Sequence, residues 1–487
     1  MSLTKTHNRM VEGSTINVLD YIPQSEYAGI RAGTSSYDAG PAIQLAINDA
    51  GAIGSGAVEV HIPAGEYIIN TPLYITTVGK GSITISGSQQ YRTQLTAGSS
   101  LSSATKPTMS GGTYTPVLSY VPIMAINVST GVFLHDLEFE GNNYDVYGLY
   151  VNETFYFNLE RIRINATNQR PYTFMRVQAA HLNVIQSYLC GQASSPDGST
   201  LFYDCSTITV SNMGMERVGT DRYSCELFQP NNKGGIVFTA PWFETNPTGN
   251  KPDLGHFSCG GRNVYMNSPY FSYGTRYTSE SSVDLKNSSQ TLSTDGLTLT
   301  TSAALSCNIE INDVSNPSLK TVIGSDAKGN TVHGFLDTAK VVNNNSSGDT
   351  NVVPNLDASG NGVTLINNGL RVSPKSNASG FLPNNYVMDV SSADGAGPIS
   401  FFNNANNKLF SDSGFLSLQS NVTLRLKPTD SAGNNVQILT SAGVSTWEKG
   451  HLQLGAYHLW VDSTGDLRIK SSAPASDTDG TIVGTQS

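Results

Sequence analysis

Short segments of alternating apolar and polar residues repeat along the middle of the chain at a spacing of 28 residues. The clearest three copies are residues 208–210, 236–238 and 264–266. Each is followed by a second short apolar segment, centred on Met215, Phe243 or Phe271. Alternation with a period of two predicts strands, and a fixed spacing of this length predicts the stacked rungs of a β-solenoid. Residues one repeat apart should then lie about 4.8 Å apart, the spacing of neighbouring strands.

The second segment of each rung can be divided into an inner and an outer side, because neighbouring residues of a strand point to opposite faces. Its apolar centres, Met215, Phe243 and Phe271, are predicted to face the core. The residues on either side should face outward, and these are Gly214, Trp242 and Tyr270 before the centre and Glu216, Glu244 and Ser272 after it.

One rung earlier, Leu182, Val184 and Leu189 fit the same columns with a spacing of 26 residues. This alignment places Tyr188 in line with Trp242 and Tyr270.

The start of the chain predicts a different element, a short helix within residues 35–50. Asp38 is suited to cap it and Pro41 to its first turn, and one face would carry Ala42, Ile43, Ala46 and Ile47. Two alternating strands around a Pro-Ala-Gly turn should follow over residues 58–70. Such a helix can cover the open end of a solenoid, which would otherwise expose an apolar core and unpaired backbone.

Residues 16–20, 42–48 and 58–67 together resemble the start of the right-handed parallel β-helix of pectate-lyase-like proteins. More narrowly they resemble bacteriophage tailspikes, which are capsule depolymerases, and residues 452–470 with 476–480 resemble the closing segment of such spikes. The resemblance implies a homotrimer in the virion tail, attached to the baseplate or an adaptor, and a polysaccharide substrate. It identifies no catalytic residue, because these spikes share architecture while their sites diverge.

The chain departs from the family in two ways. Where the family often carries a Gly-Asp-Gly-type loop before the helix, residues 29–33 form a loop of a different sequence. No large particle-binding domain precedes the solenoid, so we expect either docking through the short arm or a chain that has been shortened.

The predicted fold class is therefore all-β, a right-handed parallel β-helix with an N-terminal capping helix and a C-terminal β-sandwich-like domain. Residues 1–14 are polar and read as an arm or linker. The β-helix should extend over 15–370, with irregular rungs after Lys286. Short strands with Gly and Asn turns follow over 371–487, a domain suited to trimerisation or carbohydrate binding.

The amino-acid composition limits the kinds of partner that we expect the chain to bind. Charged residues make up 14% of the chain and the net charge is −10, which argues against a nucleic-acid surface. Membrane insertion is not expected either, because no stretch approaches the roughly 20 apolar residues of a membrane span. The 5 cysteines lack paired spacing and are read as buried thiols, consistent with assembly in a reducing host cytoplasm.

Glu216 and Glu244 are the favoured catalytic residues. Retaining glycosidases hold two carboxyl groups roughly 5–5.5 Å apart, one as nucleophile and one as acid and base. Adjacent rungs offer that separation. The competing interpretation is two solvated surface acids without a role, since carboxylates are mostly exposed.

The exposed aromatic residues Tyr188, Trp242 and Tyr270 suit stacking against the apolar faces of sugar rings. They could equally cover the rung surface or lie in a subunit contact. Segments 217–232 and 245–261 are interpreted as the longest polar loops of the repeat region, and such loops often carry functional residues. Asp221 or Asp253 could replace either glutamate, and a wider pair, roughly 6.5–9.5 Å apart, would invert the configuration. Arg222 and Tyr223 are further substrate-binding candidates.

A polysaccharide lyase is the main competing enzyme. It needs a base that removes a proton beside a uronate carboxylate, and a cation that neutralises that carboxylate. His256, Tyr273 or Tyr277 could be the base, and Arg222 or Arg276 the cation. A lone histidine is more often a hydrogen-bonded structural residue, and the net acidity of the chain suits an anionic polymer less well.

No cofactor is implied by the sequence. Residues 51–56 follow a helix rather than a strand and are no dinucleotide loop, and no His, Cys and Asp cluster has the spacing of a zinc site. Residues 357–362 could hold calcium, although a plain turn fits them better. The favoured function is an endo-glycosidase that depolymerises a bacterial capsular or surface polysaccharide, with the lyase and a non-catalytic receptor-binding spike as alternatives.

Overall fold

The computed structural model describes most of the N-terminal three quarters of the chain and, after that, mainly strands. The described residues are 15–53, 57–76, 82–191, 198–216, 218, 223–244, 255–272, 281–312, 320–335, 341–343, 351–354, 361–366, 369–374, 389–390, 399–400, 408–412, 415–419, 425–426, 436–437, 452–454 and 456–485. Two compact units divide the chain between Ala378 and Ser379.

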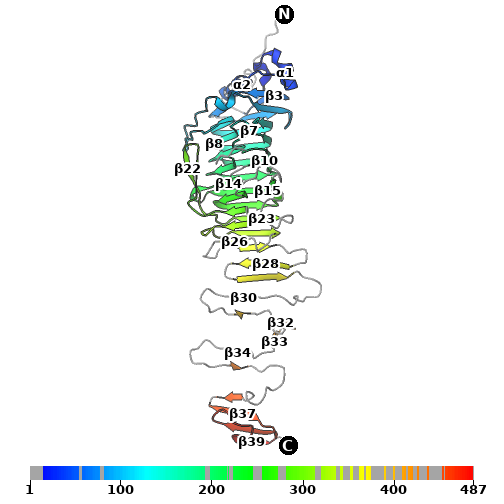
Figure 1. Cartoon of the computed structure of the whole chain (residues 1–487), viewed down its shortest axis with the longest axis vertical. Helices are drawn as coiled ribbons and strands as arrows, with labels where there is room; N and C mark the ends of the chain where they lie inside the picture. The colour runs from blue at the N-terminus through cyan, green and yellow to red at the C-terminus, as the bar shows by residue number, and fades with distance from the viewer. Residues whose placement is uncertain are drawn as a thin grey trace. The chain divides into compact units, whose positions relative to one another are not determined.

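Unit 1 is a parallel β-helix, a stack of rungs (Figure 1), and the described strands up to β20 (Ser281–Leu285) fall into three parallel columns that we call three sheets. The all-β class and the parallel β-helix predicted from the sequence are confirmed. The first sheet consists of β1 (Ile16–Asn17), β2 (Val58–Ile62), β5 (Ile83–Gly87), the middle parts of β7 (Val121–Glu140) and β8 (Val146–Asn165), the start of β10 (Gln178–Tyr188), β12 (Ser206–Ser211), β15 (Gly234–Thr239), β18 (Arg262–Asn267), β23 (Asn308–Asn312), β25 (Thr331–Phe335) and β27 (Asn351–Pro354).

The second and third sheets stack beside it in the same order. The second sheet consists of β3 (Gly65–Ile69), β6 (Thr93–Ala97), the ends of β7, β8 and β10, β13 (Gly214–Glu216), β16 (Trp242–Glu244) and β19 (Tyr270–Ser272). The third consists of β4 (Leu73–Thr76), the starts of β7 and β8, β9 (Tyr172–Met175), β11 (Thr200–Tyr203), β14 (Tyr223–Phe228), β17 (Gly255–Gly260), β20 (Ser281–Leu285), β24 (Lys320–Ile323) and β26 (Val341–Asn343).

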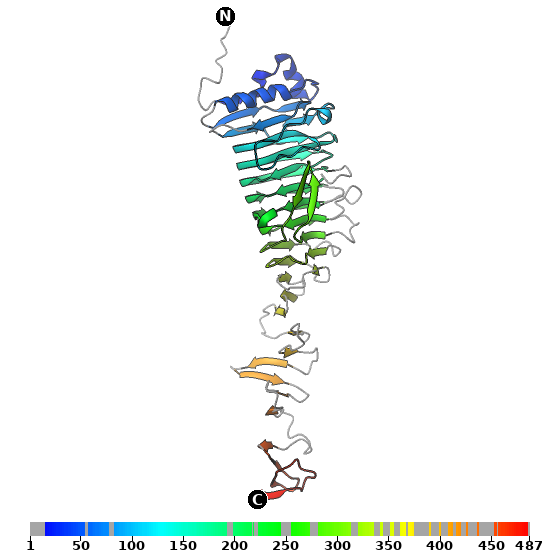
Figure 2. The ribbon, with the colours of Figure 1, turned by 90° about the vertical axis from the view of Figure 1, so that its left-hand side faces the viewer.

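The N-terminal end of the stack is covered as the sequence predicts. Helix α2 (Gly40–Ala52) lies across the first rungs (Figure 2), and Ala42, Ile43, Ala46 and Ile47 are buried in the core beneath it. Its N-cap is Ala39, one residue later than predicted, while Asp38 Oδ1 accepts a hydrogen bond from Gly40 N at 3.0 Å. The predicted strands over 58–70 are β2 and β3.

The prediction of a loop at residues 29–33 is wrong in part. Residues Tyr27–Ala32 form helix α1, and Gly33 ends it in the left-handed conformation at φ 69°, where glycine meets no Cβ penalty. Two 3-10 turns, η2 (Val18–Tyr21) and η3 (Gln24–Glu26), precede α1. Two others, η4 (Leu101–Ser103) and η5 (Pro230–Asn232), follow β6 and β14.

The outer face of the third sheet is covered, unlike that of the second. Residues 105–120 and the hairpin of β21 (Thr291–Thr294) and β22 (Leu297–Thr300) pack on it and bury a second apolar cluster, which includes Leu118, Tyr150 and Leu299. Figure 1 labels β22 beside these rungs. The strands β14 and β17 are consequently buried along their whole length.

Beyond the parallel rungs, β28 (Asn361–Ile366) and β29 (Gly369–Pro374) pair antiparallel within unit 1. Unit 2 contains the antiparallel pairs β30 (Asp389–Val390) with β31 (Ile399–Ser400), β32 (Lys408–Asp412) with β33 (Phe415–Gln419) and β34 (Arg425–Leu426) with β35 (Val436–Gln437). Its last four strands form one antiparallel sheet, β36 (Leu452–Leu454), β37 (Tyr457–Val461), β38 (Asp466–Lys470) and β39 (Thr481–Thr485). Packing of such sheets into a sandwich stays a prediction, as do the roles assigned to the predicted domains.

All 5 cysteines are buried free thiols, as the sequence predicts. Among the described residues no helix is long and apolar enough to cross a membrane.

Candidate functional site

A repeated tight bend fixes the register of the second sheet. Between the first and second sheets most rungs turn through two residues, for instance residues 240–241 between β15 and β16, whereas residues 88–92 connect β5 to β6. One residue of each bend has a left-handed backbone, and the series is Asp136, Arg161, Val184, Asn212, Ala240 and Ser268. Because six successive rungs turn in the same way, the strands that follow start at equivalent positions and their side chains stack in columns.

Glu216 and Glu244 are direct partners in this register. Strand β13 pairs parallel with β16, with Glu216 opposite Glu244 and Met215 opposite Phe243. Both glutamates are partly exposed, while Met215, Phe243 and Phe271 are at most 1% exposed. The predicted division into an inner apolar column and an outer polar side is confirmed, and the two glutamates stand on adjacent strands, which lie about 4.8 Å apart.

The predicted aromatic residues of the outer side are also in place. Trp242 is 44% exposed and Tyr270 55% exposed, and their ring centroids lie 6.2 Å apart in an edge-to-face arrangement. Gly214 precedes them in the column, and a Cβ added there would approach only Gln186 Cγ, at 3.5 Å. The column therefore has an open notch beside Glu216, followed by two aromatic rings.

Tyr188 does not lie in the same column as Trp242 and Tyr270. The predicted spacing of 26 residues for its rung is wrong, because Ala180 pairs with Ile208 and Leu182 with Val210, which continues the spacing of 28. Tyr188 consequently stands opposite Glu216 rather than Gly214. Ala180 gives a weak apolar signal, which is why the sequence favoured Leu182 at its place.

We name the two outer columns of the second sheet for the residues that mark them. The aromatic column is Glu66, Gln94, Glu138, Arg163, Gln186, Gly214, Trp242 and Tyr270. The glutamate column is Ile68, Thr96, Glu140, Asn165, Tyr188, Glu216, Glu244 and Ser272. Together they form a ledge along the outer side of the second sheet. Thr96 and Glu138 are buried within it, at 1% and 4% exposure, and the other members whose side chains the structure describes are partly or fully exposed.

The middle of this ledge is a network that the sequence analysis missed. Arg163 Nη1 contacts Glu138 Oε1 at 2.7 Å, and its guanidinium carbon lies 5.6 Å from the ring centroid of Tyr188. Burial raises the pKa of the Glu138 carboxyl, against the opposing effect of Arg163. The alternation of Glu138 and Glu140 around Phe139 was the available signal, since it repeats the pattern of the later rungs.

The segments interpreted as long loops contain strands of the third sheet. Residues 223–228 and 255–260 are β14 and β17, and all of their side chains are buried. Alternation disappears when both faces of a strand are covered, so the sequence offered no period of two here. Glu216 and Glu244 are the last residues of β13 and β16, and β14 and β17 begin at Tyr223 and Gly255.

Tyr223 and its partners form an inner polar cluster on the third sheet. Tyr223 is 6% exposed, and its hydroxyl donates to Asp284 Oδ2 at 2.6 Å. Lys286 Nζ lies 3.5 Å from the same carboxylate oxygen and 4.8 Å from the Tyr223 ring centroid. This burial makes Tyr223 a support for Asp284 rather than an exposed contact for a ligand.

Glu226 and Asp284 make a second pair of carboxylates, which the sequence analysis also missed. Glu226 stands opposite Ser258 and Ser258 opposite Asp284, so they are two rungs apart. Glu226 is fully buried and accepts a hydrogen bond from Ser199 Oγ at 2.7 Å. Since an approaching polymer needs an accessible carboxylate, exposure favours Glu216 and Glu244 over this pair.

His256, an alternative catalytic candidate, lies within the apolar interior. It is 3% exposed, and its ring centroid lies 6.0 Å from that of Phe243 and 5.8 Å from that of Phe271. Burial lowers its pKa to about 3. A neutral histidine packed between two core phenylalanines favours a structural role.

This burial leads to a prediction about pH. An unfolded chain binds a proton at His256 below about pH 6.5, whereas the native chain does so only near pH 3, so native stability falls as the pH drops between these values. Replacing His256 by phenylalanine removes that loss, which amounts to roughly 1.4 kcal/mol for each pKa unit. Melting temperatures measured by calorimetry should fall less in the variant than in the wild type as the pH drops from 7 to 4. Parallel curves would contradict the assignment.

Several candidates lie outside the described residues. These are Asp221, Arg222, Asp253, Tyr273 and Arg276, together with Tyr277 and most of residues 357–362. In the part of the chain that the structure does describe, no group of three or more His, Cys, Asp or Glu side chains is placed to hold a metal ion.

Comparison with known families gives a direct match. Residues 292–485 match the family of capsule depolymerases. The match includes the β21–β22 hairpin, the last parallel rungs and unit 2, and the resemblance stated from the sequence is confirmed to this extent. Glu216 and Glu244 precede the matched region. No curated protein matches the chain.

The solved structures similar to the chain include a viral protein, a hydrolase and a lyase. The ORF18 protein of Geobacillus virus E2 is 14% identical, covers 88% of this chain and 86% of its own, and gives a TM-score of 0.46. The endo-xylogalacturonan hydrolase from Aspergillus tubingensis is 14% identical. The match covers 70% of this chain and 95% of the hydrolase, with a TM-score of 0.41. The alginate lyase from Paenibacillus sp. str. FPU-7 is 10% identical. The match covers 64% of this chain and 95% of the lyase, with a TM-score of 0.35.

Proposed function

We propose that the protein is an endo-glycosidase that hydrolyses a bacterial capsular or surface polysaccharide, with Glu216 and Glu244 as the catalytic carboxylates. The capsule depolymerase match supports the substrate class. The observation that carries the residue assignment is the register of β13 and β16, which stacks two partly exposed glutamates on adjacent rungs of the ledge.

The spacing of the two strands that carry these carboxylates suits hydrolysis with retention of configuration. Adjacent rungs are about 4.8 Å apart, close to the roughly 5–5.5 Å between the carboxyl groups of retaining enzymes. In the first step one carboxylate attacks the anomeric carbon while the other carboxylic acid gives its proton to the departing glycosidic oxygen. In the second step the latter group takes a proton from water, and the resulting hydroxide releases the sugar from the nucleophile.

The charge of the ledge argues against a lyase acting on an uninterrupted polyuronate. The described part of the two columns carries five carboxylates (Glu66, Glu138, Glu140, Glu216 and Glu244) and one cation, Arg163. A polymer with a negative charge on every unit would be repelled. The burial of His256 also removes the imidazole from the possible bases.

Products distinguish the three candidate functions. Incubating the full chain with the host polysaccharide should release saturated oligosaccharides with new reducing ends. Fragments with an unsaturated terminus, which absorb in the ultraviolet, would show a lyase instead. A polymer that binds and remains intact would show a receptor-binding spike without catalysis.

We also infer that the protein acts in a bacteriophage tail as a homotrimer. The support is the family match and the resemblance of both ends of the chain to tailspikes. Attachment through a baseplate or adaptor, and assembly in the host cytoplasm, belong to the same proposal.

The aromatic column gives a prediction about binding. Replacing Trp242 by alanine removes a ring that is 44% exposed, and should raise KM for the polymer roughly fivefold to tenfold with little change in kcat. Tyr265, which is 40% exposed on the first sheet, supplies the matched control, and its alanine variant should behave as the wild type. An equal KM for both variants would show that Trp242 does not contact the substrate.

A further inference from the structure

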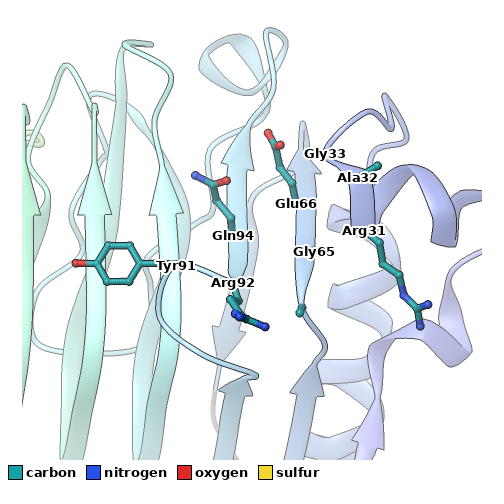
Figure 3. Close-up of a pocket in the computed structure, with 9 residues that line it drawn as sticks. Arg31, Ala32, Gly33, Gly65, Glu66, Tyr91, Arg92 and Gln94 are labelled. Atoms are coloured by element: carbon teal, nitrogen blue, oxygen red, sulfur yellow. The ribbon is translucent and has the colours of Figure 1, made fainter.

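A cavity of about 440 Å³ lies at the N-terminal end of the ledge. Helix α1 forms one wall, and the starts of β3 and β6 with the turn before β6 form the rest (Figure 3). Its polar side chains are Arg31, Glu66, Tyr91, Arg92 and Gln94. Glu66 and Gln94 are the first two residues of the aromatic column, so the cavity and the ledge share one surface.

Four of these side chains are available to a ligand. Among the residues that the structure describes, Arg31, Glu66, Arg92 and Gln94 make no side-chain hydrogen bond or ion pair. Figure 3 shows the carboxylate of Glu66 and the amide of Gln94 at one end of the cavity. The guanidinium groups of Arg31 and Arg92 lie at the other end, on opposite sides of Gly65. Two guanidinium groups against one carboxylate leave the cavity with a net positive charge.

The glycine at the end of α1 lets Glu66 take this position. A Cβ added at Gly33 would lie 2.7 Å from Glu66 Oε2, closer than a real Cβ allows. The absence of a side chain at residue 33 therefore accommodates the carboxylate at the rim of the cavity.

Tyr91 connects the cavity to the middle of the ledge. Its side chain is 60% exposed and its backbone has a left-handed φ of 71°, which is uncommon for a residue with a bulky side chain. The hydroxyl donates to Gln186 Oε1 at 3.2 Å, and the Arg163 guanidinium carbon lies 5.1 Å from the ring centroid. These contacts hold an exposed aromatic ring beside the polar groups, an arrangement suited to a sugar.

The cavity and the glutamate pair lie on the same ledge at a distance that a polymer can bridge. From Gln94 the aromatic column runs through Glu138, Arg163 and Gln186 to Gly214. Four strand spacings correspond to about 19 Å, and Gly214 is on the strand that carries Glu216. A polysaccharide chain of several units lying along the ledge would reach both places.

We propose that this cavity is a distal subsite that binds a sugar unit bearing a carboxylate, while the bond that is cut lies several units away at Glu216 and Glu244. Arg31 and Arg92 would bind the carboxylate through charge-assisted hydrogen bonds, Glu66 and Gln94 would bind hydroxyl groups, and Tyr91 would stack on the ring. The inference rests on the proposed function and specifies its substrate class, a heteropolysaccharide with an acidic unit among neutral ones. The acidic centre of the ledge and its cationic end fit such a polymer.

The test compares matched probes that differ only at the carboxylate. Methyl uronides and the corresponding neutral methyl glycosides of gluco, galacto and manno configuration are titrated against the full chain, and saturation-transfer NMR reports binding. In at least one configuration the uronide should bind about tenfold more tightly than its neutral partner. In the Arg31→Ala/Arg92→Ala variant this preference should disappear.

The control variant is Arg262→Ala/Lys328→Ala, which removes two exposed cations from elsewhere in unit 1. It should keep the preference of the wild type. Equal binding of uronide and neutral glycoside in all three configurations would overturn the proposal. So would a preference that survives in the Arg31→Ala/Arg92→Ala variant, or one that is lost in the control as well.

The outcome for the subsite can be separated from the outcome for catalysis. The binding titration needs no cleavage and gives its answer even if the chain proves to be a non-catalytic spike. If the host polymer is cleaved, the Arg31→Ala/Arg92→Ala variant should raise KM about tenfold with kcat unchanged. A fall in kcat with KM unchanged would contradict a distal binding role.

Discussion

Replacing either Glu216 or Glu244 by glutamine is expected to slow polysaccharide cleavage about 10²–10⁴-fold, the usual contribution of a positioned acid or base. Glutamine keeps the size of the side chain and the stacking of β13 on β16, but it cannot act as a nucleophile or exchange a proton. The initial rate of reducing-end release, measured on equal amounts of folded protein, is the readout.

The double variant sharpens this expectation. Two groups that act in one reaction are not additive, so the double substitution should cost little more than the more harmful single one. An exposed carboxylate away from the ledge, Asp20, provides the control, and Asp20→Asn should cleave like the wild type. Near-normal rates in both single variants would reject the pair and direct attention to Asp221 and Asp253, or to Asp284 beneath Tyr223.

Where a strand has one covered face, the amino-acid sequence was sufficient to place its side chains. Met215 and Phe243 face the core and Glu216 and Glu244 face outward, because alternation records which side is buried. The terminal helix was predictable for the same reason, since α2 has one apolar face and meets the core with it.

The third sheet could not be found in this way. Strand β14 reads Tyr-Ser-Cys-Glu-Leu-Phe, and all six side chains are buried, because core residues cover one face and the β21–β22 hairpin and residues 105–120 cover other parts of the sheet. Burial on both sides erases the period of two. The partnership of Tyr223 with Asp284 joins residues 61 apart, through connections of unequal length that no fixed spacing reveals.

The turn of the β21–β22 hairpin was predictable from the local amino-acid sequence. Asp295-Gly296 stands between two alternating segments, and both residues have left-handed backbones, with φ of 50° and 68°. This is the favoured dipeptide of a two-residue hairpin turn. What the signal does not reveal is the surface on which the hairpin packs, since that depends on residues 105–120 and on strands distant in sequence, β7, β8, β9, β11 and β14.

The carboxylate of Asp295 is expected to be the main polar anchor of the hairpin. Asp295 is 1% exposed, and its oxygens accept hydrogen bonds from Ser119 N at 2.8 Å, Tyr147 Oη at 2.8 Å and Tyr150 Oη at 3.2 Å. Removing the carboxylate takes this buried acceptor from Ser119 N and Tyr147 Oη, whereas the Tyr150 hydroxyl also lies 2.8 Å from Met175 Sδ and can donate there. Since each buried donor left unsatisfied costs about 1–3 kcal/mol, the loss should reach about 3 kcal/mol or more.

Two substitutions separate the carboxylate from the turn. Asp295→Gly keeps a residue that suits a left-handed turn position but has no acceptor, whereas Asp295→Asn suits the turn and keeps one acceptor oxygen. Hydrogen exchange should then report faster opening at Val117, whose N–H donates to Asp295 O at 2.9 Å, and at Ser119. We expect an increase of roughly a hundredfold for Asp295→Gly, which corresponds to about 3 kcal/mol, and a smaller one for Asp295→Asn. If both variants exchange like the wild type, the hairpin is held by the apolar contacts of Leu292 and Leu299 and not by the carboxylate.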